Sequence, residues 1–521
     1  NSVTQNNSHR QYLTGQLIAE YKGVFGKHDI NVLGGWSAEE NLYEDLQGKR
    51  TDIIGNELPA LNLGDTDGWS NGADENEWAL VSGFMRMNYA FASKYLVEAN
   101  FRADASSRFS KKHRWGVFPS ASVGWRITEE KFMKNQRIFD NLKLRVSWGQ
   151  LGNQNGLGMY DHIASYNIKG YYPFKSELGQ WAVISKLPSE TRTWETVEMN
   201  NFAVDMAFLR NRLTVTGEYF IKRNKDMLVN VEVPSVIGVD VPTGNYGELE
   251  VKGWEVTVGW QDRIKDFSYS ARFNLSDQKD KLVDYGVEYN GFVAGVNQKV
   301  QGYSLGSIFG YRTDGYFTSE EEVKNSAAYN KSITGVGDIK YVDKDGDGKI
   351  SAPNDLEYLG TTTPRYTFGL NLTAAWKGFD LGILFQGVGK RNFYLSSEVM
   401  NPYYATWNNF SYKMHNDYWT PENPNAAFPR YYAGANHNYQ ISDHWLQNAA
   451  YVRLKNLQLG YTIDPKLTKS WGIQRLRVYF SGDNLCEYSK LNDNFDPELS
   501  NVDGYVYPIM RNFSFGLNVT F

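Results

Sequence analysis

The sequence predicts an all-β fold, a transmembrane antiparallel β-barrel, from three observations. Apolar and polar residues alternate with a period of two in many short segments, which is the pattern of a strand with two different faces. The connections between these segments alternate between short turns and long polar loops, as they do in membrane barrels. No run approaches the ~18 to 20 apolar residues that a transmembrane helix requires. Strands are therefore the elements that we expect to face lipid.

The composition fits this class. The chain has 521 residues, a net charge of −5 and a mean hydropathy of −0.52. Aromatic residues make up 15% of it, including 35 Tyr and 15 Trp, a content that suits the aromatic girdles at the two membrane interfaces. The 48 Gly and 15 Pro favour tight turns over long helices. An aromatic-rich sugar-binding sandwich has a similar composition, so the strand pattern must distinguish the two.

The single cysteine, Cys486, excludes an intrachain disulfide framework and a cysteine metal site. The mildly negative net charge does not indicate the basic surface that nucleic-acid binding requires. The first residues contain neither a charged n-region nor an apolar h-region. We therefore expect any export signal to have been removed or to lie upstream.

The expected strands pair across tight turns. Leu17 to Phe25 precedes Ile30 to Trp36, and Val81 to Phe91 precedes Tyr95 to Arg102. Connections this short imply antiparallel hairpins. The other expected strands are Ala121 to Ile127, Leu142 to Trp148, Phe202 to Phe208, Leu213 to Ile221, Trp254 to Trp260, Phe267 to Leu275, Tyr366 to Trp376, Phe379 to Phe385, Leu457 to Ile463 and Leu476 to Phe480. About fifteen strands are expected in all, many of them near the ~9 to 11 residues of a tilted span.

The chain finishes on the clearest of these strands. From Arg511 to Phe521, apolar residues at every second position alternate with small polar residues. A soluble domain seldom ends on its most apolar strand face. A barrel, in contrast, closes its wall with the final strand and leaves no edge in lipid.

Long polar stretches separate the hairpins, at Asn41 to Glu77, Val229 to Glu250, Asp277 to Tyr366 and Lys390 to Ala450. The polar strand faces point either to bulk water, in a soluble multi-sheet protein, or to a wet lumen. The strand number favours the lumen, because twisted open sheets rarely exceed about ten strands without curling or splitting.

Asp343 to Ser351 has the spacing of a calcium loop, with carboxylates at the first, third and fifth positions and Gly348 at the sixth. Its twelfth position is Asn354 in place of Glu, and the next acidic residue, Asp355, closes the site if the loop bulges. The expected ligands of a structural Ca²⁺ are Asp343, Asp345, Asp347, Lys349 through its carbonyl, and Asp355. A plain Asp/Gly turn without an ion is the alternative.

The stretch from Asn401 to Tyr439 is rich in aromatic residues and asparagine. Rings stack on sugar faces or peptide side chains, so Tyr404, Trp407 and Asn408 are candidate substrate-binding residues. A loop packed on its own side chains is the alternative. No HExxH motif occurs, so no catalytic residue is proposed and an enzyme is not indicated.

Several collinear motifs together resemble the SusC/RagA family of TonB-dependent outer-membrane transporters from Bacteroidetes. Their residues are Arg102 to Phe109, Arg114 to Ser120 with Gly124-Trp125-Arg126, Ser147 to Gln154, Gly337 to Tyr341 before the Asp343 loop, Tyr418 to Pro424, Tyr451 to Asn456, Asn484-Leu485, Asp496-Pro497-Glu498 and Tyr507-Pro508. These motifs cover nearly the whole chain.

The resemblance implies a 22-stranded barrel in the outer membrane of a Gram-negative bacterium. It also implies an N-terminal plug, energy from the TonB complex, a SusD-like surface lipoprotein as a lid, and oligosaccharide or peptide cargo. Residues 1–521 are then the C-terminal portion of the barrel, and 337–359 form a calcium-loop-like insertion in an external loop.

The chain has about half the length expected of the family, with no plug or TonB box. We therefore expect a companion chain that carries the plug and the N-terminal strands, because unpaired backbone groups in lipid cost several kcal/mol each. A passive outer-membrane porin, a surface adhesin or barrel enzyme, and a soluble glycan-binding protein remain as alternatives.

Overall fold

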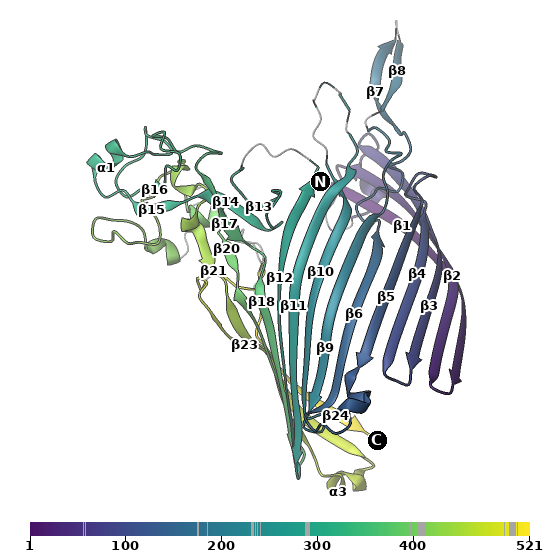
Figure 1. Ribbon diagram of the computed structural model, residues 1–521. Coiled ribbons are helices and arrows are strands. Elements are labelled where there is room, and N and C mark those ends of the chain that lie inside the picture. Colours follow the sequence, from purple (N-terminus) through teal and green to yellow (C-terminus); the bar gives the residue numbers. More distant parts are fainter. Residues whose placement is uncertain are drawn as a thin grey trace. The chain divides into compact units, whose positions relative to one another are not determined.

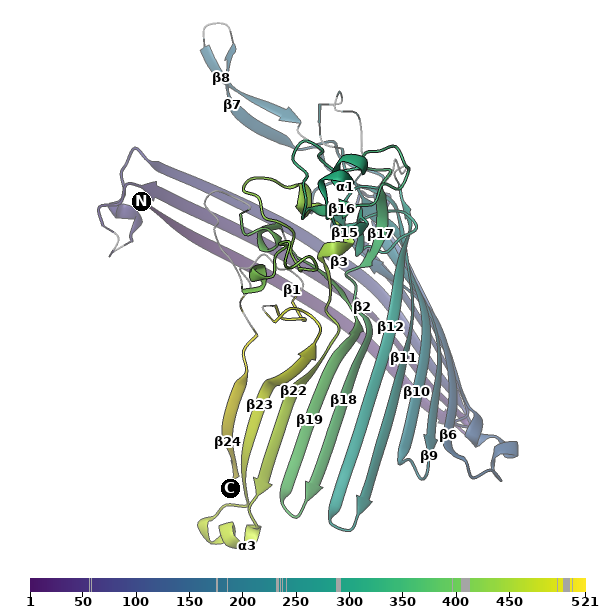
Figure 2. The same ribbon diagram turned by 90° about the vertical axis from the view of Figure 1, so that its left-hand side faces the viewer.

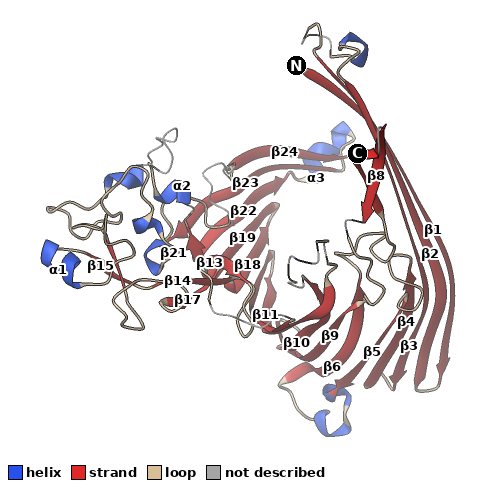
Figure 3. Ribbon diagram, turned by 90° about the horizontal axis from the view of Figure 1, so that it is seen from above, coloured by secondary structure: helices blue, strands red, loops and turns tan. Residues whose placement is uncertain are grey.

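The computed structural model consists mainly of long strands with short helices between them (Figure 3). It describes residues 1–55, 57, 59–174, 177–184, 186–230, 234, 236, 238–239, 241–286, 292–395, 397–403, 413–493, 495–499, 507 and 509–521. Among these residues no helix has the length and apolar content that crossing a bilayer requires.

The main sheet contains fifteen strands among the described residues. In their hydrogen-bonded order they are β1 (Ser2–Phe25), β2 (His28–Thr51), β3 (Trp69–Phe91), β4 (Tyr95–Ser106), β5 (Trp115–Arg126), β6 (Phe139–Asn153), β9 (Glu195–Phe208), β10 (Leu213–Val229), β11 (Gly244–Ile264), β12 (Phe267–Tyr285), β18 (Arg365–Trp376), β19 (Phe379–Lys390), β22 (Tyr451–Thr462), β23 (Arg475–Ser489) and β24 (Asn512–Thr520). The expected number of about fifteen strands is confirmed. Strands that are neighbours in this sheet are also consecutive in the sequence, once the short strands within the loops are left out.

Smaller elements lie in the loops. They are the hairpin β7 (Tyr166–Phe174) with β8 (Glu177–Ile184), the sheet of β13 (Gly295–Gln298), β14 (Ser307–Tyr311) and β17 (Leu356–Thr361), the pairs β15 (Thr313–Tyr316) with β16 (Ile339–Tyr341) and β20 (Asn392–Tyr394) with β21 (Leu446–Asn448), and the helices α1 (Glu320–Asn325), α2 (Ser397–Met400) and α3 (Pro465–Thr468).

The chain divides into two compact units. The first comprises Asn1–Glu130, Arg145–Asn201 and Lys222–Leu249. In it β1 to β5 pair antiparallel in sequence order. Short turns join these strands at one end, and the β7–β8 hairpin extends beyond the opposite end (Figure 1). This separates short turns from long loops, as the sequence predicts.

The two faces of these strands differ in chemistry. Met85 and Phe101 are each half exposed, at 50%, and they pair directly across β3 and β4. On the opposite face Ser82 is 1% exposed and accepts a hydrogen bond from Arg102, which also donates to Asp104. Apolar side chains thus point outward, where lipid would cover them, while the polar face holds an ion-pair network.

The second unit comprises Lys131–Leu144, Phe202–Ile221 and Glu250–Phe521. Its strands β12, β18, β19, β22, β23 and β24 also pair antiparallel in this order (Figure 2). In the last strand Phe513, Phe515 and Leu517 are exposed by 60% or more, which agrees with the lipid-facing pattern expected for Arg511 to Phe521.

Several strand ends were predicted wrongly. The expected loop from Asn41 to Glu77 is shorter, because β2 continues to Thr51 and β3 begins at Trp69. Similarly, β12 continues to Tyr285 and β22 begins at Tyr451. The extensions of β2, β3 and β12 consist mostly of polar and charged residues, so they lack the alternation that marks a strand next to lipid. The start of β22 does alternate, with Val452 and Leu454 on one face and Arg453 on the other.

Candidate functional site

The loops of the second unit pack around an apolar core of their own. Tyr311, Ile339, Leu356, Phe393 and Trp445 are all buried in it. The whole of β14 is buried as well. Since the core draws side chains from loops on either side of β18 and β19, these loops form one ordered structure.

A buried carboxylate connects two of these loops. Asp338 is completely buried and accepts hydrogen bonds from His437 Nε2 at 2.9 Å, Asn438 Nδ2 at 2.9 Å and Tyr432 Oη at 3.0 Å. Burying an unpaired carboxylate would be costly, and these donors remove that cost. Asp338, the acidic residue of the Gly337 to Tyr341 motif, therefore holds the two loops together through hydrogen bonds.

A second buried group joins the wall to the loop between β23 and β24. Arg453 is 2% exposed. It forms ion pairs with Glu487, with Asp496 at 2.7 Å and with Glu498 at 2.8 Å.

Two further cations complete this cluster. Lys455 pairs with Glu498 at 2.9 Å, and Arg391 donates to the carbonyl of Leu499 at 2.9 Å. Two cations, Arg453 and Lys455, therefore pair with three carboxylates, and Arg391 binds the backbone of the same loop. The motifs Tyr451 to Asn456 and Asp496-Pro497-Glu498 are thus partners in one structure.

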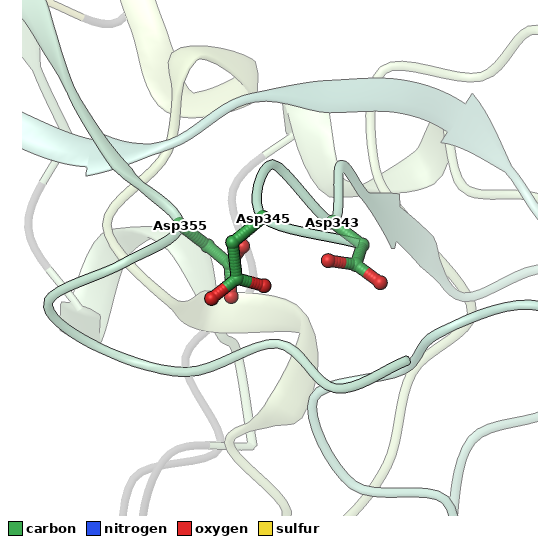
Figure 4. A group of neighbouring side chains, drawn as sticks. All are labelled: Asp343, Asp345 and Asp355. Carbon is green, nitrogen blue, oxygen red and sulfur yellow. The ribbon is translucent and has the colours of Figure 1, made fainter. Parts of the chain in front are cut away.

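The expected calcium loop brings three of its carboxylates together (Figure 4). One oxygen from each of Asp343, Asp345 and Asp355 lies within 4.8 Å of the others. Asp355 is 1% exposed and accepts from the backbone N–H of Ser351 at 2.7 Å. The loop thus bulges enough to bring Asp355 to the other two carboxylates.

One expected carboxylate ligand is outside this group. The carboxylate of Asp347 accepts from the backbone N–H of Lys349 at 2.8 Å, and Asp347 does not belong to the three-carboxylate group. The Lys349 carbonyl stays a predicted ligand. Gly346 and Gly348 have positive φ angles of 75° and 83°, and both donate to Asp343. Glycine suits these positions because a Cβ would be strained there.

The candidate substrate residues Tyr404, Trp407 and Asn408 lie outside the described residues. A cavity of about 690 Å³ is lined by four described residues of the same stretch and three from the loop after β23, namely Lys413, Met414, Asn416, Asp417, Leu491, Asn492 and Asp493. The described rings of the same stretch, such as Phe428 and Tyr431, pack against one another and on the loop core. Self-packing thus accounts for these rings.

Comparison with known proteins identifies the family. The family model described as TonB dependent receptor-like, beta-barrel matches residues 1–485. This chain belongs to that family. Its members, SusC among them, are outer-membrane β-barrels of Gram-negative bacteria, and this TonB-dependent receptor chain has the same location and fold.

The relatives of this TonB-dependent receptor chain extend beyond it. TonB-dependent receptor P3 of Formosa agariphila is 29% identical over 99% of this chain, which spans 52% of that protein. TonB-dependent receptor SusC of Bacteroides thetaiotaomicron is 28% identical over the whole chain, which spans 50% of SusC. The chain therefore spans about half the length of these relatives.

A solved structure has the same fold. The RagAB peptide transporter matches 99% of this chain with a TM-score of 0.84 and 24% identity, and the chain covers 56% of the matched chain. The resemblance to SusC and RagA found in the sequence motifs is confirmed. Sequence reasoning missed the roles of Asp338 and Arg453, since only the fold shows that their partners lie about 40 to 100 residues away.

Proposed function

We propose that this chain forms part of a transporter that imports oligosaccharides or peptides across the outer membrane with energy from the TonB complex. A SusD-like lipoprotein would cover its outer loops. The observation that carries this proposal is the two-faced sheet, which is apolar outside and polar inside, with an ordered loop structure at the end of its second unit. The proposed activity makes or breaks no bond, so the chain has no enzymatic role in it.

We also propose that other strands complete the barrel. The sheet order begins at β1 and ends at β24, which leaves one backbone edge of each strand unpaired among the described residues. Unpaired N–H and C=O groups cost several kcal/mol each in hydrocarbon. A companion segment that carries the plug and the remaining strands would remove this cost and would provide the contact with TonB.

Uptake by cells tests this function. The complete receptor should import labelled oligosaccharide or peptide only in cells that contain TonB and the lipoprotein. Import that persists after deletion of TonB would contradict the proposal and would instead indicate a passive porin.

A structural Ca²⁺ is a further proposal for the Asp343 loop. Asp343, Asp345 and Asp355 would bind it, because three converging carboxylates suit a hard cation. The bound ion would hold the connection between β16 and β17. It would have no part in transport chemistry.

Limited proteolysis between Ser319 and Leu359 tests the ion. Calcium should slow cleavage and EDTA should accelerate it in the parent protein. In Asp343→Asn with Asp345→Asn the difference should disappear, while Glu321→Gln in helix α1 should retain it. Equal cleavage rates of the parent protein in calcium and EDTA would show that the loop is a plain Asp/Gly turn.

Tyr404, Trp407 and Asn408 remain our proposed cargo contacts. Trp407→Ala should weaken cargo binding without reducing the amount of folded barrel in the membrane. Unchanged affinity and uptake would remove Trp407 from the site.

A further inference from the structure

The long strands β1 to β3 bring aromatic rings together on one face. In the strand register Tyr12 lies opposite Asn41, which lies opposite Trp78. The two rings lean over the small Asn41 until their centroids are 6.3 Å apart. Asn41 is consequently only 7% exposed. Tyr43 is the next residue of β2 on the same face, about 7 Å along the strand.

Charged side chains hold these rings in place. Arg10 lies over the Tyr43 ring at 5.2 Å, and Arg108 lies over the Trp78 ring at 5.4 Å. Cation–π contacts of this length stabilise a ring in one orientation. Tyr12 is held by its hydroxyl, which donates to Glu39 at 2.7 Å. The group is therefore preorganised, although Tyr12 is still 53% exposed.

The group lies on the polar face of the wall. Side chains alternate between faces along a strand, so Trp78 shares a face with Ser82 and not with the outward Met85. On the outward face of β3 the residues change from apolar Val81 and Ala79 to acidic Glu77 and Glu75. Acidic residues mark the end of the lipid-facing band. The rings therefore lie at the outer mouth, on the lumenal side.

We propose that Tyr12, Tyr43 and Trp78 form a binding platform for a neutral oligosaccharide, which we call the aromatic platform. This inference rests on the proposed transport function and assigns a cargo class to it. The exposed ring of Tyr12 offers an apolar face to a sugar ring, while the arginines that lie over Tyr43 and Trp78 can donate to its hydroxyls. The two rows of rings lie about 7 Å apart along the strand. This spacing exceeds the width of a single sugar ring, so the platform suits an oligomer.

The charges around the platform favour a neutral ligand. Glu39, Asp45 and Asp74 lie on the same face as Arg10 and Arg108, so the charges nearly cancel. A polyanion would meet the carboxylates, whereas sugar hydroxyls can donate to them. An extended peptide often binds through a free strand edge. Tyr43 and Trp78 lie on β2 and β3, each of which pairs on both sides, so these two residues offer no such edge.

Binding by the complete receptor tests the platform. The probes are neutral hexasaccharides of α-glucan, β-glucan, fructan, xylan and mannan types, with a pool of tryptic peptides for comparison. At least one saccharide should bind, and Tyr12→Ala with Trp78→Ala should weaken it about tenfold or more. Tyr12→Phe keeps the ring and should retain most of the affinity. Tyr21→Ala, an exposed ring on the opposite face of β1, should have no effect.

Heat-modifiable migration in gels should show that every variant folds. If no saccharide binds, if only peptides bind, or if the double variant binds as the parent does, the aromatic platform is disproved. A failure of the proposed TonB-dependent transport would give a different result. In that case the parent protein would import its cargo without TonB, whatever the platform variants do.

Discussion

At the scale of single residues, buried charges fix the loops to the wall. Arg453 is surrounded by three carboxylates, and Asp338 by three side-chain donors. Such groups are stable inside a protein only when they are fully paired. Both residues belong to motifs shared with the transporter family, and their contacts give those motifs a structural explanation that involves no cargo.

Replacing Arg453 tests this explanation. Arg453→Met leaves Glu487, Asp496 and Glu498 with one fewer cation, which should cost roughly 3–5 kcal/mol because the remaining charges are partly buried. Unfolding by denaturant in lipid vesicles would measure it. Lys22→Met, which breaks the exposed pair with Glu20, should cost less than about 1 kcal/mol. Equal losses in the two variants would contradict the structural role of Arg453.

The loop structure should also depend on pH. Burial lowers the pKa of both His415 and His444 below the ordinary value, although each ring is hydrogen-bonded to a backbone carbonyl. The unfolded loops therefore bind protons more readily than the folded loops. Stability is complete above the unfolded pKa of about 6.5 and falls as the pH decreases below it.

Hydrogen exchange would measure this effect. Backbone amides of residues 413–445 should exchange faster at pH 5.5 than at pH 7.5, after correction for the intrinsic rates. His415→Gln with His444→Gln keeps a donor at each position and should reduce the difference. A difference of the same size in this double variant would place the pH dependence elsewhere.

At the scale of elements, the strands combine two environments. In β24 the outward positions are apolar along the whole strand, whereas β1, β2 and β3 continue for many residues beyond their apolar band. The alternation is strong only next to lipid, since water requires no apolar face. This explains why the pairing of the hairpins was predicted well and their outer ends were not.

A charge on the lipid side of β24 should be costly. Phe515→Arg places a cation in mid-strand on the outward face, and we expect a loss of roughly 2–4 kcal/mol near the bilayer midplane. Ser514→Arg, on the opposite face, should cost clearly less. Refolding into vesicles at graded urea concentrations would compare the two. If Ser514→Arg proves the more damaging, the assignment of the two faces is reversed.

At the scale of the whole molecule, the open edges of β1 and β24 matter most. Residues 1–521 alone should aggregate or fail to give the heat-modifiable band of a folded barrel, because both edges would meet hydrocarbon. Production together with the companion segment proposed above should restore that band. A folded, monodisperse protein from residues 1–521 alone in plain buffer would contradict the membrane assignment.

Local patterns in the sequence were enough to predict the class, the membrane location, the approximate strand number and the family. These properties depend on local periodicity and on motifs, which neighbouring residues carry. The folded chain was needed to show that Asp355 joins Asp343 and Asp345 without Asp347, and that Tyr12 and Trp78 lean together over Asn41. Each of these contacts requires a loop path or a strand register, and the positions of distant residues are fixed only when the backbone pairs.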